Sequence, residues 1–172
     1  DLMEKHPALW LTQQIRDDQS SPFYKLVHVA GPKQKDAMYL IRQKSLYDGI
    51  AKLHTRLDVN LKQGDNLRIL PTLIIRFFSA VKKRWPNEWN DPKKYLLMTN
   101  TGMQALGIIG AQMIERQVRA RKVDEDEFLR DLKTAHFSWE KGQGDQKLPT
   151  GRAGGEIIAQ EILKSIHGTE ID

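Results

Sequence analysis

Clusters of arginine and lysine are the part of this sequence with the clearest capacity for chemistry. Four cations, Arg116, Arg119, Arg121 and Lys122, follow the apolar run that starts at Met98. Grouped guanidinium and ammonium ions bind phosphate oxygens, and neutralising DNA phosphates raises affinity because counterions are released. Other cations lie at the end of a second amphipathic segment and in a glycine-rich stretch. The candidate nucleic-acid-binding residues are therefore Arg116, Arg119, Arg121, Lys122, Lys82, Lys83, Arg84 and Arg152.

The first four of these cations have a second interpretation that needs no partner. They come at the end of an expected helix, where positive charge interacts favourably with the helix macrodipole. The acidic run "DEDE" at residues 124–127 follows directly and suits the first turn of the next helix. The cluster is therefore either a working surface for an anion or the solvated end of a core helix.

The sequence lacks the residue patterns of the common catalytic and metal sites. It has no cysteine, which excludes thiolate nucleophiles and cysteine-bound zinc. The five histidines are far apart and form no metal-ligand spacing, and there is no P-loop or nucleophile elbow. We therefore expect no catalytic residue, metal ligand or cofactor site inside this chain. Whether it belongs to an enzyme stays open.

The stretch "TGRAGGEII", Thr150 to Ile158, offers one more way to hold a phosphate. Glycines before a helix can present backbone N–H groups to an anion, and Arg152 would add charge. The alternative is a flexible loop that leads into the last helix. The pattern alone does not distinguish the two.

Length and composition indicate one folded domain. The chain has 172 residues, 40% hydrophobic and 28% charged, which is typical of globular proteins, and its net charge of +5 favours anionic partners. We expect a cytoplasmic protein with no membrane partner, because no run is long and apolar enough to cross a bilayer and the first residues lack a signal peptide's order. Large apolar residues near the start predict the C-terminal part of a longer protein.

Hydrophobic periodicity predicts a mainly α-helical domain with one small β-hairpin near the N-terminus. The hairpin is expected between Phe23 and Ile41, where β-prone runs flank the turn residues "AGPKQKD". The first helix is expected over 2–18, with Pro7 in its first turn or dividing it, and the second over 46–57 after Ser45 as N-cap. A third helix is expected over 67–85, with Pro71 in its first turn. Further helices are expected to begin at Asn100 or Thr101 and at Asp124, and the last is expected over 156–167, up to Gly168.

The helix that begins near Asn100 is expected to be the centre of the core. Its apolar residues go nearly all round the helix, and Gly102, Gly107 and Gly110 would allow neighbours to approach closely. Phe77 is expected to be buried, and Trp85 and Trp89 of "WPNEW" are assigned to packing.

Several stretches resemble the C-terminal half of the DGQHR-domain proteins, the DndB-like branch of the ParB-like superfamily. In chain order they are "DDQSSPFYKLVHVAG", "SLYDGIAKL", "FFSAVKKRWPNEW", "LLMTNTGMQALGII" and the late Trp139 before a glycine-rich loop. The resemblance covers most of the chain. The Asp-Gly-Gln-His-Arg signature that names the family lies in its N-terminal part and is absent here, since Asp48-Gly49 continues as Ile-Ala-Lys.

The resemblance implies a DNA-binding regulatory or accessory protein of a bacterial DNA-modification system of the phosphorothioation type, or of a defence system. DNA and other proteins of such a system would be its partners. No site residue of the family is carried over to this chain. Two other functions stay open: the C-terminal part of a nucleic-acid-processing enzyme whose active site lies upstream, and a helical protein-interaction module.

Overall fold

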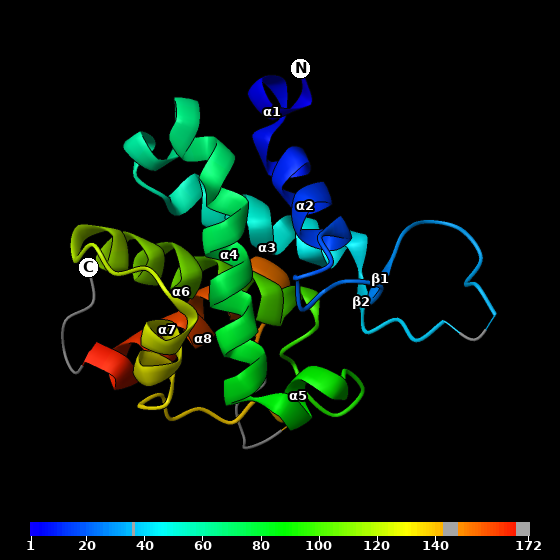
Figure 1. Ribbon diagram of the computed structural model, residues 1–172. Helices are drawn as coiled ribbons and strands as arrows, with labels where there is room; N and C mark the ends of the chain where they lie inside the picture. The colour runs from blue at the N-terminus through cyan, green and yellow to red at the C-terminus, as the bar shows by residue number, and fades with distance from the viewer. Residues whose placement is uncertain (36, 143–147, 168–172) are drawn as a thin grey trace.

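The computed structural model describes residues 1–35, 37–142 and 148–167, and over these ranges the chain is mainly helical (Figure 1). The predicted fold class is confirmed. The elements are α1 (Leu2–Lys5), α2 (Pro7–Asp17), β1 (Val27–His28), β2 (Ile41–Arg42), α3 (Gln43–Arg56), the 3-10 helix η1 (Val59–Lys62), α4 (Gly64–Arg84), α5 (Pro86–Asn90), α6 (Asn100–Arg119), α7 (Glu125–Leu132) and α8 (Gly151–His167).

The two short strands lie in the predicted segment, but they run parallel. Val27 pairs with Ile41 and His28 with Arg42. A hairpin would bring the chain back antiparallel; here the connection swings out from the body as a long loop before β2 enters (Figure 1). The small sheet is therefore present without the predicted hairpin turn. Strand propensity indicates that a segment is extended, whereas the direction of so short a pairing is set by the tertiary packing around it.

Prolines mark several helix boundaries. Pro7 divides the N-terminal helix, because His6 has a non-helical backbone with φ −138° and ψ 67° and Pro7 then begins α2. Pro86 begins α5 in the same way, directly after Trp85. Pro71 was predicted in a first turn and instead lies inside α4, because α4 already begins at Gly64. The residues before Leu67 are polar and gave no hydrophobic signal for this early start.

Side-chain caps fix two of the predicted helix starts. The Thr99 hydroxyl accepts from the N–H of Gly102 at 3.3 Å, so α6 begins at Asn100. Asp124 caps α7 as predicted, because its carboxylate accepts from the N–H of Glu127 at 2.8 Å. The helix predicted after Ser45 begins earlier, at Gln43, directly after β2.

The last helix begins at Gly151, five residues before its predicted start at Glu156. Gly154 and Gly155 therefore lie within the first turns of α8 rather than in a loop before it. The reason is tertiary contact: α8 packs on α6, and that contact needs residues without side chains at these places. The middle of the predicted glycine-rich loop, 143–147, and the predicted stop at Gly168 lie outside the described residues.

The core is built around α6, as the sequence predicted. Its residues Met103, Leu106, Ile109 and Met113 are fully buried. The helices α3 and α8 pack along α6, while α4 crosses it (Figure 1). The predicted packing residues of α4 and α5 are confirmed as core: Phe77, Trp85 and Trp89 are all at most 2% exposed.

Candidate nucleic-acid interface

The four cations at the end of α6 have different surroundings. Arg116 and Arg119 lie on the last turns of the helix and line a hollow beside α3. Arg121 lies beyond the helix with a left-handed backbone, φ 58°, which turns the chain toward α7. The Lys122 ammonium lies 2.8 Å from the carboxylate of Glu127. The acids that follow α6 therefore engage Lys122, whereas the two arginines face the hollow.

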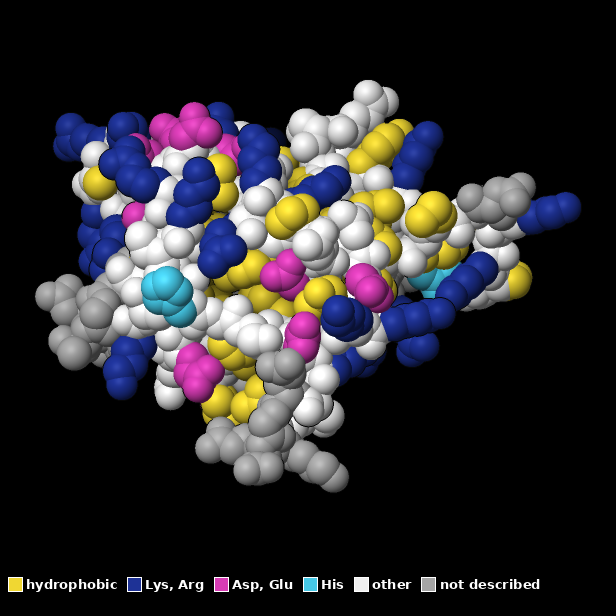
Figure 2. All heavy atoms as spheres, turned by 90° about the horizontal axis from the view of Figure 1, so that it is seen from below, with side chains coloured by type: hydrophobic (Ala, Val, Ile, Leu, Met, Phe, Trp, Pro, Cys, Tyr) yellow, Lys and Arg dark blue, Asp and Glu magenta, His cyan; other side chains and the backbone are white. Residues whose placement is uncertain are grey.

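The cations at the end of α4 hold α7 in place. Lys83 forms an ion pair with Glu125, while Lys82 is exposed. Arg84 donates from Nε to the carbonyl of Leu132 and from Nη2 to that of Ala135, both at 2.9 Å. Leu132 is the last residue of α7 and Ala135 follows it in the chain, so Arg84 acts as a side-chain cap at this end of the helix. Seen from below, the surface shows many Lys and Arg side chains around a group of Asp and Glu side chains at the upper left (Figure 2).

Three arginines meet over a hollow of about 270 Å³ on the opposite side of α6 from α4. Arg56 comes from the last turn of α3, and Arg116 and Arg119 come from α6. Gln112 and Glu115 line the same hollow. We call this place the arginine groove. A guanidinium group presents a planar fork of N–H donors that suits phosphate oxygens, and three of them around one hollow favour an anion there.

The positive charge continues from the groove along α3 to α8. The carboxylate of Glu156 lies 3.6 Å from Arg56, 3.7 Å from Arg152 and 3.9 Å from Lys52. One carboxylate therefore faces three cations. Burial lowers the pKa of the Lys52 ammonium below its usual value, and the positive charges of Arg152 and Arg56 lower it further, against the opposing effect of Glu156. This excess of positive charge is what an anionic ligand would relieve.

Glycines bring these three helices close enough for the side chains to meet. A Cβ at Gly107 of α6 would lie 2.4 Å from the carbonyl oxygen of Gly49 in α3, so the two backbones are nearly in contact. A Cβ at Gly155 of α8 would lie 3.0 Å from the backbone nitrogen of Ala105 in α6. The prediction that the α6 glycines allow close neighbours is thus confirmed at Gly107. Because α3, α6 and α8 lie so close together, Lys52, one turn after Gly49 on α3, comes within 3.9 Å of Glu156 on α8.

Two cations of this surface, Lys52 and Arg56, were missed at the sequence level. They are four residues apart on α3, the spacing that places side chains on one helix face. That spacing was a usable signal, but nothing local indicates that this face lies beside Arg116 and Arg152. The glycines of the predicted phosphate loop have another use, since the N–H of Gly151 donates to the Thr101 hydroxyl at 2.7 Å. Arg152 does face the proposed surface, through Glu156.

The lining of the groove includes one acid, Glu115. Glu115 accepts a hydrogen bond from the N–H of Asp58 at 2.6 Å, which holds this acid at the groove's edge. No group of three or more His, Asp or Glu side chains that could hold a metal ion occurs among the described residues. Within the same ranges, no helix has the length and apolarity needed to cross a membrane.

Comparisons with models of protein families, with curated proteins and with solved structures found no match for this chain.

Proposed function

We propose that this protein binds DNA through its phosphate backbone, as a regulatory or accessory protein of a bacterial DNA-modification system of the phosphorothioation type or of a defence system. One observation supports the DNA-binding part of the proposal: Arg56, Arg116 and Arg119 line a single hollow. Arg56 also belongs to the group of cations around Glu156. The kind of system comes from the resemblance to the DndB-like proteins. Phosphates are the ligand that fits, because forked donors around a hollow recognise tetrahedral oxyanions.

The binding proposed here is independent of DNA sequence. The arginines of the groove come from two helices, α3 and α6, and surround a hollow, so they offer charge to the DNA backbone rather than a single projecting recognition helix. Such contacts fix a protein on the duplex and give affinity that falls steeply with salt. Sequence or modification recognition would then come from another part of the full-length protein or from a partner.

The test is the salt dependence of duplex binding, measured by fluorescence anisotropy with a labelled duplex of random sequence. The salt concentration runs from about 50 to 200 mM, a range over which log affinity falls linearly with log salt. The groove variant changes Arg56, Arg116 and Arg119 to Gln. Each lost phosphate contact flattens the plot of log affinity against log salt by about 0.9, so the groove variant should flatten it by about 2.7.

Two further triple variants keep the loss of charge matched. One variant changes three of the other predicted cations to Gln: Lys82, Arg121 and Lys122. The second variant removes exposed positive charge elsewhere by changing Lys5, Lys93 and Lys164 to Gln. An equal effect in all three variants would show that net charge alone acts. A slope that stays unchanged in the groove variant, or an unaltered protein that does not bind duplex at low salt, would refute the proposal.

Arg84→Gln separates structure from binding among the predicted cations. Its guanidinium caps the end of α7, so its loss should lower the free energy of unfolding by about 1–3 kcal/mol. The salt slope should stay as in the unaltered protein. A flattened slope at unchanged stability would instead place Arg84 on DNA.

A further inference from the structure

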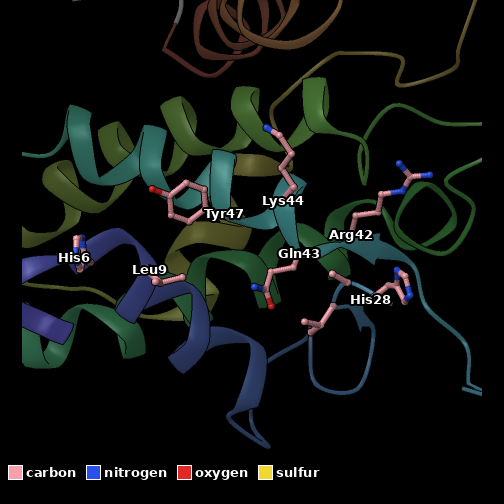
Figure 3. A pocket seen from close by; sticks show the side chains of 9 residues that line it. His6, Leu9, His28, Arg42, Gln43, Lys44 and Tyr47 are labelled. Carbon is pink, nitrogen blue, oxygen red and sulfur yellow. The ribbon is translucent and has the colours of Figure 1, made fainter. Parts of the chain in front are cut away.

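A second hollow, of about 560 Å³, lies between α2, the paired strands and the start of α3. Pockets for small ligands have volumes of about 300–1,000 Å³. Its lining includes His6, Leu9, His28, Arg42, Gln43 and Tyr47. In Figure 3, Arg42 and His28 lie at one end of this pocket, while His6, Leu9 and Tyr47 lie at the other. The pocket is therefore cationic at one end and apolar with an aromatic ring at the other.

The segment that frames the pocket carries most of the net charge of the chain. From Tyr24 to Lys44 there are five cations and one acid, Asp36, so this segment has a net charge of +4 out of +5 for the whole chain. The Arg42 side chain is exposed, and it forms no hydrogen bond or ion pair with any described residue. An anion bound at this end would meet a guanidinium group that no described side chain has neutralised.

The histidine at the Arg42 end of the pocket is held in a fixed position. His28 and Arg42 are paired partners in the small parallel sheet, so their side chains leave neighbouring positions. The His28 ring is held from two sides, with Nε2 2.9 Å from the carbonyl oxygen of Gly31 and the ring centre 5.1 Å from that of Tyr39. When Nε2–H donates to Gly31, Nδ1 is left as an acceptor. Gly31 has φ 113°, a conformation that favours glycine, so the loop is shaped for this contact.

The other end offers an aromatic surface. Tyr47 is 38% exposed although it lies on α3 beside buried residues. An exposed aromatic ring next to Leu9 is a platform on which a planar heterocycle stacks. Between the two ends, Gln43 accepts from the Arg16 guanidinium at 2.5 Å through its amide oxygen. Its amide nitrogen is left to donate to an acceptor on a bound ring.

We propose that this pocket binds a nucleotide, with the base on Tyr47 and the phosphate at Arg42. A nucleotide joins a planar ring that stacks and hydrogen-bonds to an anion, which matches the two ends and the amide between them. Two sources have this chemistry, a free nucleoside phosphate and a nucleotide of a single strand. The inference goes beyond the proposed function, because none of the pocket residues belongs to the arginine groove.

The test uses two probes on the whole chain: adenosine monophosphate by calorimetry, and a short fluorescein-labelled oligothymidylate by anisotropy. Tyr47→Ala should weaken binding by about 5- to 150-fold, the range for one stacked base. Arg42→Gln should weaken it by about 10-fold or more, because it removes a charge-assisted hydrogen bond. Lys93→Gln, which removes an exposed charge far along the chain, is the matched control and should bind as the unaltered protein does.

The two probes also identify the source. If the pocket variants lose binding of both adenosine monophosphate and the oligonucleotide, the site accepts nucleotides in general. If the unaltered protein binds the oligonucleotide alone, the ligand is a nucleotide within a single strand. The groove variant should still bind adenosine monophosphate, so failure of duplex binding and failure of this proposal are distinguishable. Binding that survives Tyr47→Ala and is displaced equally by inorganic phosphate would show a simple anion site and overturn the proposal. Affinity weaker than about 1 mM for both probes would also overturn it.

Discussion

Replacing Gly107 by alanine tests the close packing that brings α3 to α6. Alanine in a helix is ordinarily more stable than glycine by about 0.8–1.0 kcal/mol. Here the added Cβ would lie 2.4 Å from the carbonyl oxygen of Gly49 and 3.1 Å from the Cβ of Lys52. A carbon and a carbonyl oxygen normally approach to about 3.3 Å, so α3 must move by about 1 Å. Overpacking costs about 1–3 kcal/mol, and a clash with backbone lies in the upper part of that range because backbone cannot rotate away as a side chain can. After the helix gain is subtracted, the net loss is about 1–2 kcal/mol.

The loss is measured by urea unfolding followed by circular dichroism, and it corresponds to a fall in Tm of about 2–4 °C for each kcal/mol in a chain of this size. Gly110→Ala should cost less, because its Cβ would meet the ends of the Phe77 and Leu53 side chains, at 2.9 and 3.0 Å, which can shift. Thr72→Ala, at an exposed position of α4, is the control and should be neutral or slightly stabilising. Stability equal to or above that of the unaltered protein in Gly107→Ala would refute the reasoning.

Two other predictions concern the core and the pH dependence of stability. Phe77→Ala should cost about 3–5 kcal/mol, because the ring is fully buried and packs edge-on against Phe78 and Phe128, at 5.1 and 5.7 Å between ring centres; a loss under about 1 kcal/mol in urea unfolding would contradict this. Burial, aided by the charge of Lys62, lowers the pKa of His54, so the unfolded chain binds the proton more readily and stability should fall as pH drops through about 6.5. His54→Gln should make the urea midpoint less dependent on pH in that range, and an unchanged dependence would contradict the assignment.

The sequence was most informative where local chemistry decides the structure. The helix start at Asp124, the helix end next to Trp85 and the apolar residues all round α6 each depend on chemistry within a few residues, and the structure confirms all three. The predicted helix boundaries were wrong where the sequence carries no local signal for them. The first turn of α4 was missed because its residues are polar and exposed and carry no hydrophobic signal. The glycine-containing first turn of α8 was missed because its close contact with α6 is not visible in the local sequence.

The candidate site likewise combines features that local sequence predicts with features that only the tertiary structure decides. The sequence by itself placed cations at the ends of helices and predicted that the α6 glycines admit close neighbours. It left two interpretations of the basic cluster open, because the charges of residues 116–127 neutralise one another locally whether or not a partner binds. Only the tertiary structure showed that Lys122 lies against Glu127 and that Arg84 caps α7.

Tertiary structure alone also brought Arg56 to the hollow of Arg116 and Arg119, from a helix 60 residues earlier in the chain. Composition fixes the amount of charge, and periodicity fixes which helix face carries it. The distance between charges on different helices depends on how closely the backbones pack. In this protein that distance is set where Gly107 of α6 meets Gly49 of α3, because the absence of two side chains lets one helix rest on the other.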